Sequence, residues 1–527
     1  MRLLPVLAAV VVSVSAQVDT AWVRRLNGAG DSADLPAALV TNPSGGVWVT
    51  GHSFDDDTIE DFATVRYDAA GEAVWFRRFD GRGDTSARAT ALAVDAEGNC
   101  YVTGKAWQEG GRFDWMTALH DSDGIVRWAV YHSGSLAEND EARAVAAYPG
   151  GGCVVTGAAF GPAGNWDFTT IRYGADAETL WTANHNGDAN SADEAEALGI
   201  DSVGHIYVAG SSRNTGTNVD VVTVKYDGVG ETLWARRWTG TGGNDEDKAT
   251  CLVVDASQSV YVGGYTEGWG TGRDFALVKY SRHGDTLWTR RYNGSGDDDD
   301  EVVGIGTDAR GRVYVCGYSG GDGTFADYLV ICYSPLGDSL WARRWDYGGY
   351  GNWATALVVD GDGNSYITGY GFGPATQYDF HTISLGPDGT PRWQTRYSGY
   401  ANDWDQPVGI GLDADRNVYV AGFSMSNSQD FEYVTIKYVQ APGVEETPSA
   451  EVRTTNRGPT IVRGVLRLPA SLITHHSSLI TSDGRKVMDL KPGPNDASRL
   501  APGIYFLQSI DGSRLSAFGM QKIIVTR

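Results

Sequence analysis

The sequence predicts an all-β protein built as a closed ring of eight repeats, and three observations support this fold class. Each repeat contains short segments of alternating apolar and polar residues, separated by Gly, Asn and Asp turns. Tryptophans recur at separations of 53, 53, 53, 53, 54, 53 and 52 residues, as Trp22, Trp75, Trp128, Trp181, Trp234, Trp288, Trp341 and Trp393. The glycine of a Tyr-Val-Thr-Gly-like tetrapeptide keeps the same spacing, as Gly51, Gly104, Gly157, Gly210, Gly264, Gly317, Gly369 and Gly422. A period this long indicates one supersecondary unit per repeat.

Each repeat predicts four short antiparallel strands. In residues 87–134 the segments ATALAVD, CYVTG, DWMTALH and IVRWAVYHSG are separated by AEGN, a longer loop and DSDG. No helical periodicity appears in the array. Four-stranded antiparallel units repeated many times are typical of the blades of a β-propeller, whereas β-helices use shorter repeats.

The ends of the array predict how the ring closes. The first periodic element is a lone outer strand, residues 20–25, and the last repeat stops at Tyr438 without a tryptophan strand. Pairing these fragments completes an eighth blade and removes an exposed edge. Only small residues stand thirteen positions before each anchor glycine, as expected near a central axis: Ala38, Ala91, Ala144, Ala197, Cys251, Gly304, Ala356 and Gly409.

The chain divides into four segments. Residues 1–16 are predicted to be a secretory signal peptide, because Arg2 precedes an apolar run and Val14-Ser15-Ala16 suits cleavage before Gln17. Residues 17–438 form the propeller, 439–458 an acidic linker rich in Pro and Thr, and 459–527 a small C-terminal β-sandwich. No later stretch reaches about 20 apolar residues, so we expect an exported mature chain without a transmembrane segment.

The charge balance limits the partners. With 66 acidic against 42 basic residues and a pI near 4.7, the chain lacks the basic footprint of a nucleic-acid or anionic-membrane binder. A cationic or neutral ligand fits better. The five cysteines are an odd number, and we expect buried thiols; Cys316 and Cys332 are the pair to test for a disulfide.

The repeat unit resembles the bacterial SBBP-type β-propeller repeat family. The resemblance rests on DAEGNCYVTG (95–104), DFATVRY (61–67) and WTRRYNG (288–294), and it covers residues 20–438. It implies the propeller fold and says little about chemistry. The family is named for seven blades, whereas this chain shows eight copies. Two repeats depart from the pattern, because Val130-Tyr131 and Ala183-Asn184 replace the arginine pair after Trp128 and Trp181.

The C-terminal segment resembles the sorting domains of proteins exported by the type IX secretion system. The resemblance rests on LITSDGRKVMDL (479–490), LAPGIYFLQ (500–508) and KIIVTR (522–527). It implies a small β-sandwich that acts as an address, recognition by type IX-like machinery, and release or attachment at the outer cell surface.

Strand connectivity predicts two different faces. The turns between the first and second and between the third and fourth strands share one face and are short and uniform. The longer, variable loops share the other face, and binding residues concentrate in such loops. The loop-rich face carries four non-periodic tryptophans as candidate ligand-binding residues: Trp107, Trp269, Trp353 and Trp404.

A column of carboxylates precedes the innermost strand on the same face. Asp34, Asp140, Asp193, Asp247, Asp300 and Asp405 stand seventeen residues before the anchor glycine, with Ala87 and Asn352 in the other repeats. One interpretation is a broken ring that binds a cationic ligand or Ca²⁺, since oxygen ligands suit Ca²⁺. The other is structural, each carboxylate accepting hydrogen bonds from loop amides, and repetition in nearly every blade favours it. We therefore expect no cofactor, with Ca²⁺ as an open alternative that calorimetry tests.

A second column opens the third strand, as Asp61, Asp114, Asp167, Asp220, Asp274, Asp327, Asp379 and Glu432. Arginines three residues after the tryptophan predict cross-strand ion pairs with these carboxylates.

Three classes of function follow. Nucleophile and metalloprotease motifs are missing, namely G-x-S-x-G, H-E-x-x-H and C-x-x-C, so the leading hypothesis is an exported scaffold for binding or adhesion, with a glycan or protein as ligand. An extracellular carbohydrate-active hydrolase or lyase using loop-face carboxylates is the second hypothesis. A structural surface-layer component is the third. We expect the specific function in what does not repeat: the unequal loops, the extra tryptophans and the blades without arginines.

Overall fold

The computed structural model describes two parts of the chain. The first is residues 18–440, apart from 29–31, 55–58, 82–84, 110, 136–137, 188, 190, 214, 216–217, 241–245, 269, 322–323, 347–349, 374–375, 400–403 and 427–429. The second is the backbone of the strands between 460 and 525. The proposed signal peptide and most of the proposed linker lie outside the described residues. Contacts divide the chain between Gly443 and Val444.

Eight four-stranded antiparallel sheets make up the first unit, and we call them blades 1 to 8. The strands of each blade are given from the innermost to the outermost. Blades 1 to 4 are β2 (Leu35–Thr41), β3 (Val47–Phe54), β4 (Glu60–Tyr67), β5 (Ala73–Phe79); β6 (Ala87–Val94), β7 (Cys100–Gln108), β8 (Arg112–His120), β9 (Val126–His132); β10 (Glu141–Ala147), β11 (Cys153–Phe160), β12 (Trp166–Tyr173), β13 (Thr179–His185); and β14 (Asp193–Ile200), β15 (Ile206–Arg213), β16 (Val219–Tyr226), β17 (Thr232–Trp238). Blades 5 to 8 are β18 (Asp247–Val254), β19 (Val260–Gly268), β20 (Gly272–Tyr280), β21 (Thr286–Tyr292); β22 (Glu301–Thr307), β23 (Val313–Gly321), β24 (Thr324–Tyr333), β25 (Ser339–Trp345); β26 (Asn352–Val359), β27 (Ser365–Gly373), β28 (Thr376–Leu385), β29 (Pro391–Tyr397); and β30 (Asp405–Leu412), β31 (Val418–Met425), β32 (Phe431–Gln440), β1 (Val18–Leu26).

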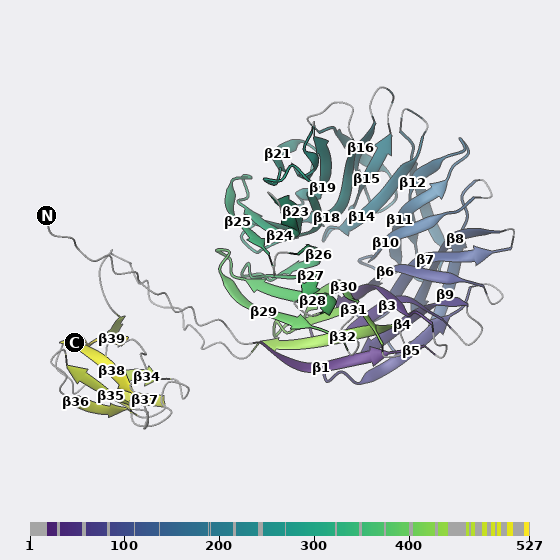
Figure 1. Cartoon of the computed structure of the whole chain (residues 1–527). Coiled ribbons are helices and arrows are strands. Elements are labelled where there is room, and N and C mark those ends of the chain that lie inside the picture. Colours follow the sequence, from purple (N-terminus) through teal and green to yellow (C-terminus); the bar gives the residue numbers. More distant parts are fainter. Residues whose placement is uncertain are drawn as a thin grey trace. The chain divides into compact units, whose positions relative to one another are not determined.

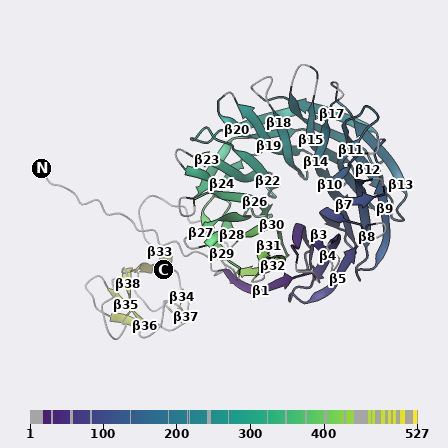
Figure 2. The same ribbon diagram turned by 45° about the vertical axis from the view of Figure 1, so that its right-hand side comes forward.

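The blades stand radially about one axis, with each innermost strand facing those of the neighbouring blades (Figures 1 and 2). Blade 8 has the order β1-β32-β31-β30, so the N-terminal strand supplies its outer edge. Val18 pairs with Gln440 and Leu26 with Tyr433. The eight-bladed, all-β propeller predicted from the sequence is confirmed, and β1 lies where ring closure requires it.

The anchor positions require glycine because every innermost strand has a β-bulge opposite them. In blade 2 the pairing of β6 with β7 shifts between Ala89 and Ala91, and the same shift recurs in the other blades. A Cβ on Gly104 would lie 2.0 Å from the Arg88 carbonyl oxygen, and the other anchor glycines meet a comparable backbone oxygen. No side chain fits there, which explains the repeat.

The periodic tryptophans connect neighbouring blades. Seven of them donate their indole N–H to a backbone carbonyl in the turn between the third and fourth strands of the next blade, at 2.9–3.2 Å. Trp393 donates instead to the Gln440 side chain at 3.4 Å. The turn glycine lies against the ring: a Cβ on Gly284, whose φ is +84°, would lie 2.8 Å from Trp234.

Cross-strand ion pairs follow the predicted pattern in five blades. Arginine three residues after the tryptophan pairs with the carboxylate that opens the third strand: Arg25–Glu432, Arg237–Asp220, Arg291–Asp274, Arg344–Asp327 and Arg396–Asp379. In blade 2, where this arginine is replaced by Tyr131, Asp114 pairs with Arg112 at 3.1 Å. These carboxylates therefore serve the blades.

The hydrophobic core lies between the sheets. Trp48, Phe62 and Trp75 of blade 1, for example, pack with Met116 of blade 2. All five cysteines are free, and all but Cys251 are buried. Cys316 and Cys332 form no disulfide: Cys316 pairs with Val330 across β23 and β24, and Cys332 with Tyr314.

The second unit is also built from strands. One sheet has the order β33-β39-β38-β35-β36, with β33 (Thr460–Val462), β35 (Ser477–Thr481), β36 (Lys486–Leu490), β38 (Gly503–Ser509) and β39 (Gln521–Val525). The other pairs β34 (Val465–Leu468) with β37 (Gly493–Asp496). Among the described residues of the whole chain, no helix has the length and apolar character needed to cross a membrane.

Candidate functional site

The predicted carboxylate column holds loop backbone in place. Asp140 is 1% exposed and accepts hydrogen bonds from the amides of Gly134 at 2.6 Å and Phe160 at 2.5 Å. The other members are equally buried and accept at least one amide hydrogen bond from the preceding loop: Asp34, Asp193, Asp247, Asp300 and Asp405. These are the contacts that the structural interpretation expects.

Burial dominates the electrostatics of this column. It raises the pKa of Asp140 to about 6, although the amides of Gly134 and Phe160 act in the opposite direction. Burial likewise raises the pKa of Asp34 and that of Asp300. Within the part of the chain that the structure describes, no group of three or more His, Cys, Asp or Glu side chains has a metal-binding arrangement. Calcium binding stays a prediction for calorimetry.

Two of the four candidate tryptophans meet in one cluster of rings. Trp353 and Trp404 both contact Tyr378, at centroid distances of 6.0 and 5.5 Å. Trp107 lies apart in blade 2, packed edge-on against Phe113 at 5.0 Å. Trp269 lies outside the described residues.

The cluster extends over the loop face of blades 7 and 8, and we call it the aromatic platform. Two members are exposed and six are half-buried, and they form a continuous chain of ring contacts: Tyr350, Trp353, Tyr370, Phe372, Tyr378, Trp404, Phe423 and Phe431. Tyr350 is 54% exposed and Trp404 40%. An exposed cluster of aromatic side chains of this kind makes this surface a candidate binding site.

An acidic pocket of about 760 Å³ adjoins the platform through Trp353. It is lined by Asp297, Asp298 and Asp299, by Phe325, and by backbone at Gly272 and Gly320. The three aspartates are exposed, and Asp299 accepts the amide N–H of Arg273 at 3.0 Å. The pocket therefore offers carboxylate acceptors next to aromatic rings, an arrangement suited to hydroxyl-bearing or cationic groups.

Sequence reasoning named two rings of the platform and missed six. The missed residues lie in or beside the unequal loops of the last two repeats, where YGGYGNW, GYGFG and QYDF are rich in aromatic residues. Counting aromatic residues per loop would have singled out these blades. Their mutual contact could not be read from the sequence, because strands of two sheets bring them together.

One comparison with known proteins, that with a protein-family model, agrees with the fold. Residues 287–323 match the SBBP family model, described as a beta-propeller repeat, and the match together with the eight blades supports the propeller family. No curated protein matches the chain.

Several solved structures resemble the chain distantly. They include a protein of unknown function from Dyadobacter fermentans (9% identity, 80% of this chain and 99% of that chain covered, TM-score 0.35) and one from Bacteroides caccae (13%, 55% and 92%, 0.30). A gluconolactonase from Xanthomonas campestris is similar at 9% identity, with 52% and 82% covered and a TM-score of 0.28. At these TM-scores the likenesses assign no activity to this chain.

Proposed function

We propose that the protein is an exported scaffold that binds an extracellular glycan through the loop-rich face of its propeller. The observation that carries the proposal is the aromatic platform beside the acidic pocket. Aromatic faces pack against the apolar faces of sugar rings, and carboxylates accept hydrogen bonds from sugar hydroxyls. A rigid ring that presents variable loops suits such recognition.

Glycan arrays and calorimetry with the full chain test this proposal. Trp404→Ala and Tyr350→Ala should each weaken binding about tenfold, because each removes an exposed ring of the platform. Trp166→Ala is the matched control: Trp166 is 38% exposed in blade 3, outside the platform, and its loss should leave the affinity unchanged. Equal loss in all three variants, or no glycan bound by the wild type, contradicts the proposal.

Activity assays distinguish the second hypothesis. Release of shorter products from a bound polysaccharide, abolished by Asp298→Asn, would assign a hydrolase or lyase instead. If the chain instead captures a protein, and substitutions in the aromatic platform abolish that capture, the binding-scaffold hypothesis holds with a protein as the ligand. Concentration-dependent assembly of the purified chain would favour a surface-layer component.

Export is the other part of the proposal. Cleavage before Gln17 would leave β1 complete, since β1 begins at Val18, and the C-terminal unit would act as a β-sandwich sorting domain. Mass spectrometry of the secreted protein should find a chain beginning at Gln17. Removing residues 459–527 should hold the protein inside the outer membrane, whereas unchanged secretion would contradict the sorting role.

A further inference from the structure

Lysines of the third strand fill a recurring niche between blades on the turn face. In blades 4, 5 and 8 the ammonium groups of Lys225, Lys279 and Lys437 lie 4.7–5.0 Å from the ring centroid of a second-strand tyrosine. In the same three blades that tyrosine donates to the aspartate that opens the turn between the first and second strands. The niche thus combines a cation–π contact with a carboxylate.

A backbone carbonyl of the next blade completes each niche. The Arg282 oxygen accepts both the Trp234 indole at 3.1 Å and the Lys225 ammonium at 3.2 Å. The Pro335 and Ala69 oxygens accept an indole and a lysine in the same way.

Other blades place a guanidinium there when the lysine is absent. In blade 6 the third-strand residue is Cys332, and Arg312 reaches in from the turn to bind Asp308 at 2.6 Å and the Pro387 oxygen at 2.9 Å. Arg66 and Arg172 stack on Trp48 and Tyr148 in blades 1 and 3.

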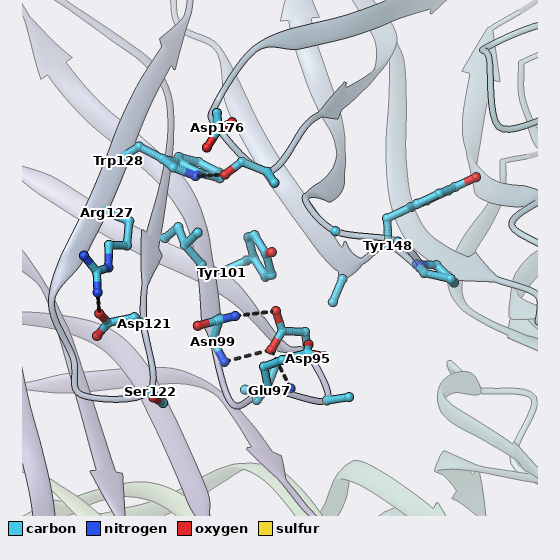
Figure 3. Close-up of a pocket in the computed structure, with 18 of the residues that line it drawn as sticks. Asp95, Glu97, Asn99, Tyr101, Asp121, Ser122, Arg127, Trp128, Tyr148 and Asp176 are labelled. Carbon is cyan, nitrogen blue, oxygen red and sulfur yellow. Dashed lines mark hydrogen bonds and ion pairs between the residues drawn. The ribbon is translucent and has the colours of Figure 1, made fainter.

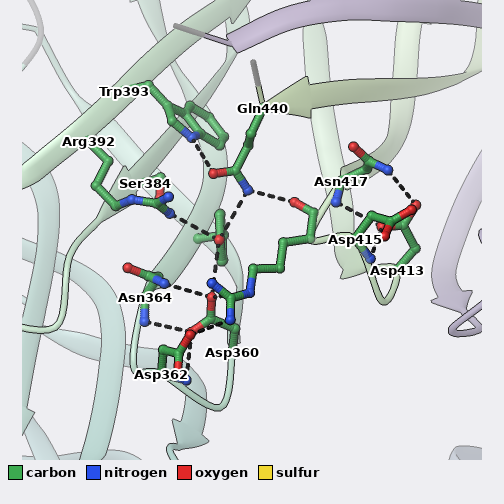
Figure 4. A network of polar contacts seen from close by, with 12 residues as sticks. Asp360, Asp362, Asn364, Ser384, Arg392, Trp393, Asp413, Asp415, Asn417 and Gln440 are labelled. Carbon is green, nitrogen blue, oxygen red and sulfur yellow. Dashed lines mark hydrogen bonds and ion pairs between the residues drawn. The ribbon is translucent and has the colours of Figure 1, made fainter. Parts of the chain in front are cut away.

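In blade 7, two arginines supply the positive charge in this niche (Figure 4). Its third-strand residue is Ser384, Arg392 donates to the Tyr366 hydroxyl at 3.1 Å, and Arg416 lies 3.4 Å from Asp360. A cation from the chain therefore occupies the turn side of blades 1 and 3 to 8.

Blade 2 keeps the niche, but none of its described residues places a cation there. Its third-strand residue is Leu119, and a pocket of about 1160 Å³ opens there, lined by Asp95, Tyr101 and Trp128 among others (Figure 3). The Trp128 indole donates to the Ala175 oxygen at 2.9 Å, as in the other blades.

Blade 8 shows what blade 2 is missing. Asp413, Asn417, Tyr419 and Lys437 have the same spacing as Asp95, Asn99, Tyr101 and Leu119, and the asparagine donates to the aspartate at 2.8 Å in both blades. In blade 8 the same carboxylate oxygen also faces Lys437 at 3.6 Å, which shows that it can accept a further cation.

The surroundings of the pocket favour positive charge. Its lining includes five carboxylates, those of Asp95, Glu97, Asp121, Asp123 and Asp176, and one guanidinium, that of Arg127. Arg127 is directed to Asp121, with Nη2 and Oδ2 at 2.5 Å, and its side chain is 59% exposed (Figure 3). Within the described part of the chain, no cationic side chain therefore lies at Asp95 and Tyr101.

We propose that the blade 2 niche binds an external primary ammonium group on an aliphatic stem, as carried by a lysine side chain or a free alkyl diamine. The ammonium would take the place that Lys437 occupies in blade 8, over the Tyr101 ring and beside the Asp95 carboxylate. This site is on the face opposite the aromatic platform, so a result that contradicts one proposal leaves the other untouched.

Calorimetry with the full chain at low ionic strength tests the site. Nα-acetyl-lysine methylamide represents a lysine in a peptide, 1,5-diaminopentane a free diamine, and Nα-acetyl-norleucine methylamide the neutral analogue. At least one amine should bind at one site per chain, at least tenfold more tightly than the norleucine derivative. The tighter of the two amines identifies the source of the ligand.

Substitutions at Leu119 separate the niche from the general attraction of an acidic protein for cations. Leu119→Lys should abolish binding, because the chain then fills its own niche, whereas Leu119→Met should retain it. Lys225→Leu, with folding checked by circular dichroism, should open a second niche in blade 4 and raise the stoichiometry from one to two. Equal affinity of charged and neutral probes, or unchanged binding by Leu119→Lys, overturns the proposal.

Discussion

At the scale of single residues, the same aspartate column allows a ligand site or a loop anchor, and burial with amide hydrogen bonds favours the anchor role. Asp140 is surrounded by protein and its oxygens face the amides of Gly134 and Phe160. Spacing located the column, because the period of the repeat places it just before each inner strand. The partners of each carboxylate come from the loop fold, which the spacing does not contain.

Asp140→Asn should change how stability depends on pH. The pKa of Asp140 is raised from 3.8 to about 6, so its contribution to folding is fully present below pH 4 and is lost as pH rises through about 6. Asparagine cannot ionise, and the wild type should therefore lose up to about 3 kcal/mol relative to Asp140→Asn between pH 4 and 7. Urea unfolding at several pH values measures this difference. Asp19→Asn, at an exposed position of β1, is the control for the loss of one charge and should show no such trend.

At the scale of the strand and turn, six blades are each attached to the next blade by a tryptophan and the turn glycine that its ring covers. The indole N–H satisfies a turn carbonyl, and the ring covers a glycine with a positive φ. Both residue types were visible as regular columns, but only the structure shows that one column contacts the other across blades. There are two exceptions: Trp128 meets a turn of blade 3 with Ala177 at a φ of 70°, and Trp393 meets Gln440 of blade 8.

Gly284→Ala should destabilise the propeller more than Gly164→Ala. Both glycines have a φ of +84°, so both substitutions carry the same backbone strain. A Cβ on Gly284 would meet Trp234 at 2.8 Å, whereas one on Gly164 would meet nothing within 4 Å. We expect an extra loss of about 1–3 kcal/mol for Gly284→Ala in chemical denaturation. Equal losses in the two variants would mean that the contact between residue 284 and the Trp234 ring adapts to the added methyl group at no cost in stability.

At the scale of the whole molecule, stability depends on closure of the ring by a strand from the far end of the chain. β1 pairs along its length with β32 and buries Trp22 against blade 1. Without β1, the edge of β32 would be unpaired and open to association with other chains.

Deleting residues 18–26 should therefore lower the melting temperature and cause aggregation. Loss of the buried Trp22 alone costs about 3–5 kcal/mol, and the ladder adds to this. Scanning calorimetry and size-exclusion chromatography measure the two effects. A synthetic peptide of residues 18–26, added to the truncated chain, should restore part of the stability. A truncated chain that melts like the wild type would show that β1 is dispensable.

The repeats by themselves determined the all-β class, the eight blades, the strand boundaries within a few residues and the use of both ends in one blade. They could do so because the alternation of residues within a repeat and the number of repeats are both properties of the linear sequence. The tertiary structure alone decided which loops meet and which niches stay open. The aromatic platform draws rings from two sheets, and the Leu119 pocket exists only because residues of neighbouring blades surround a place where other blades carry a cation. Such sites depend on contacts between residues far apart in the sequence, and the repeat pattern averages over the positions where they differ.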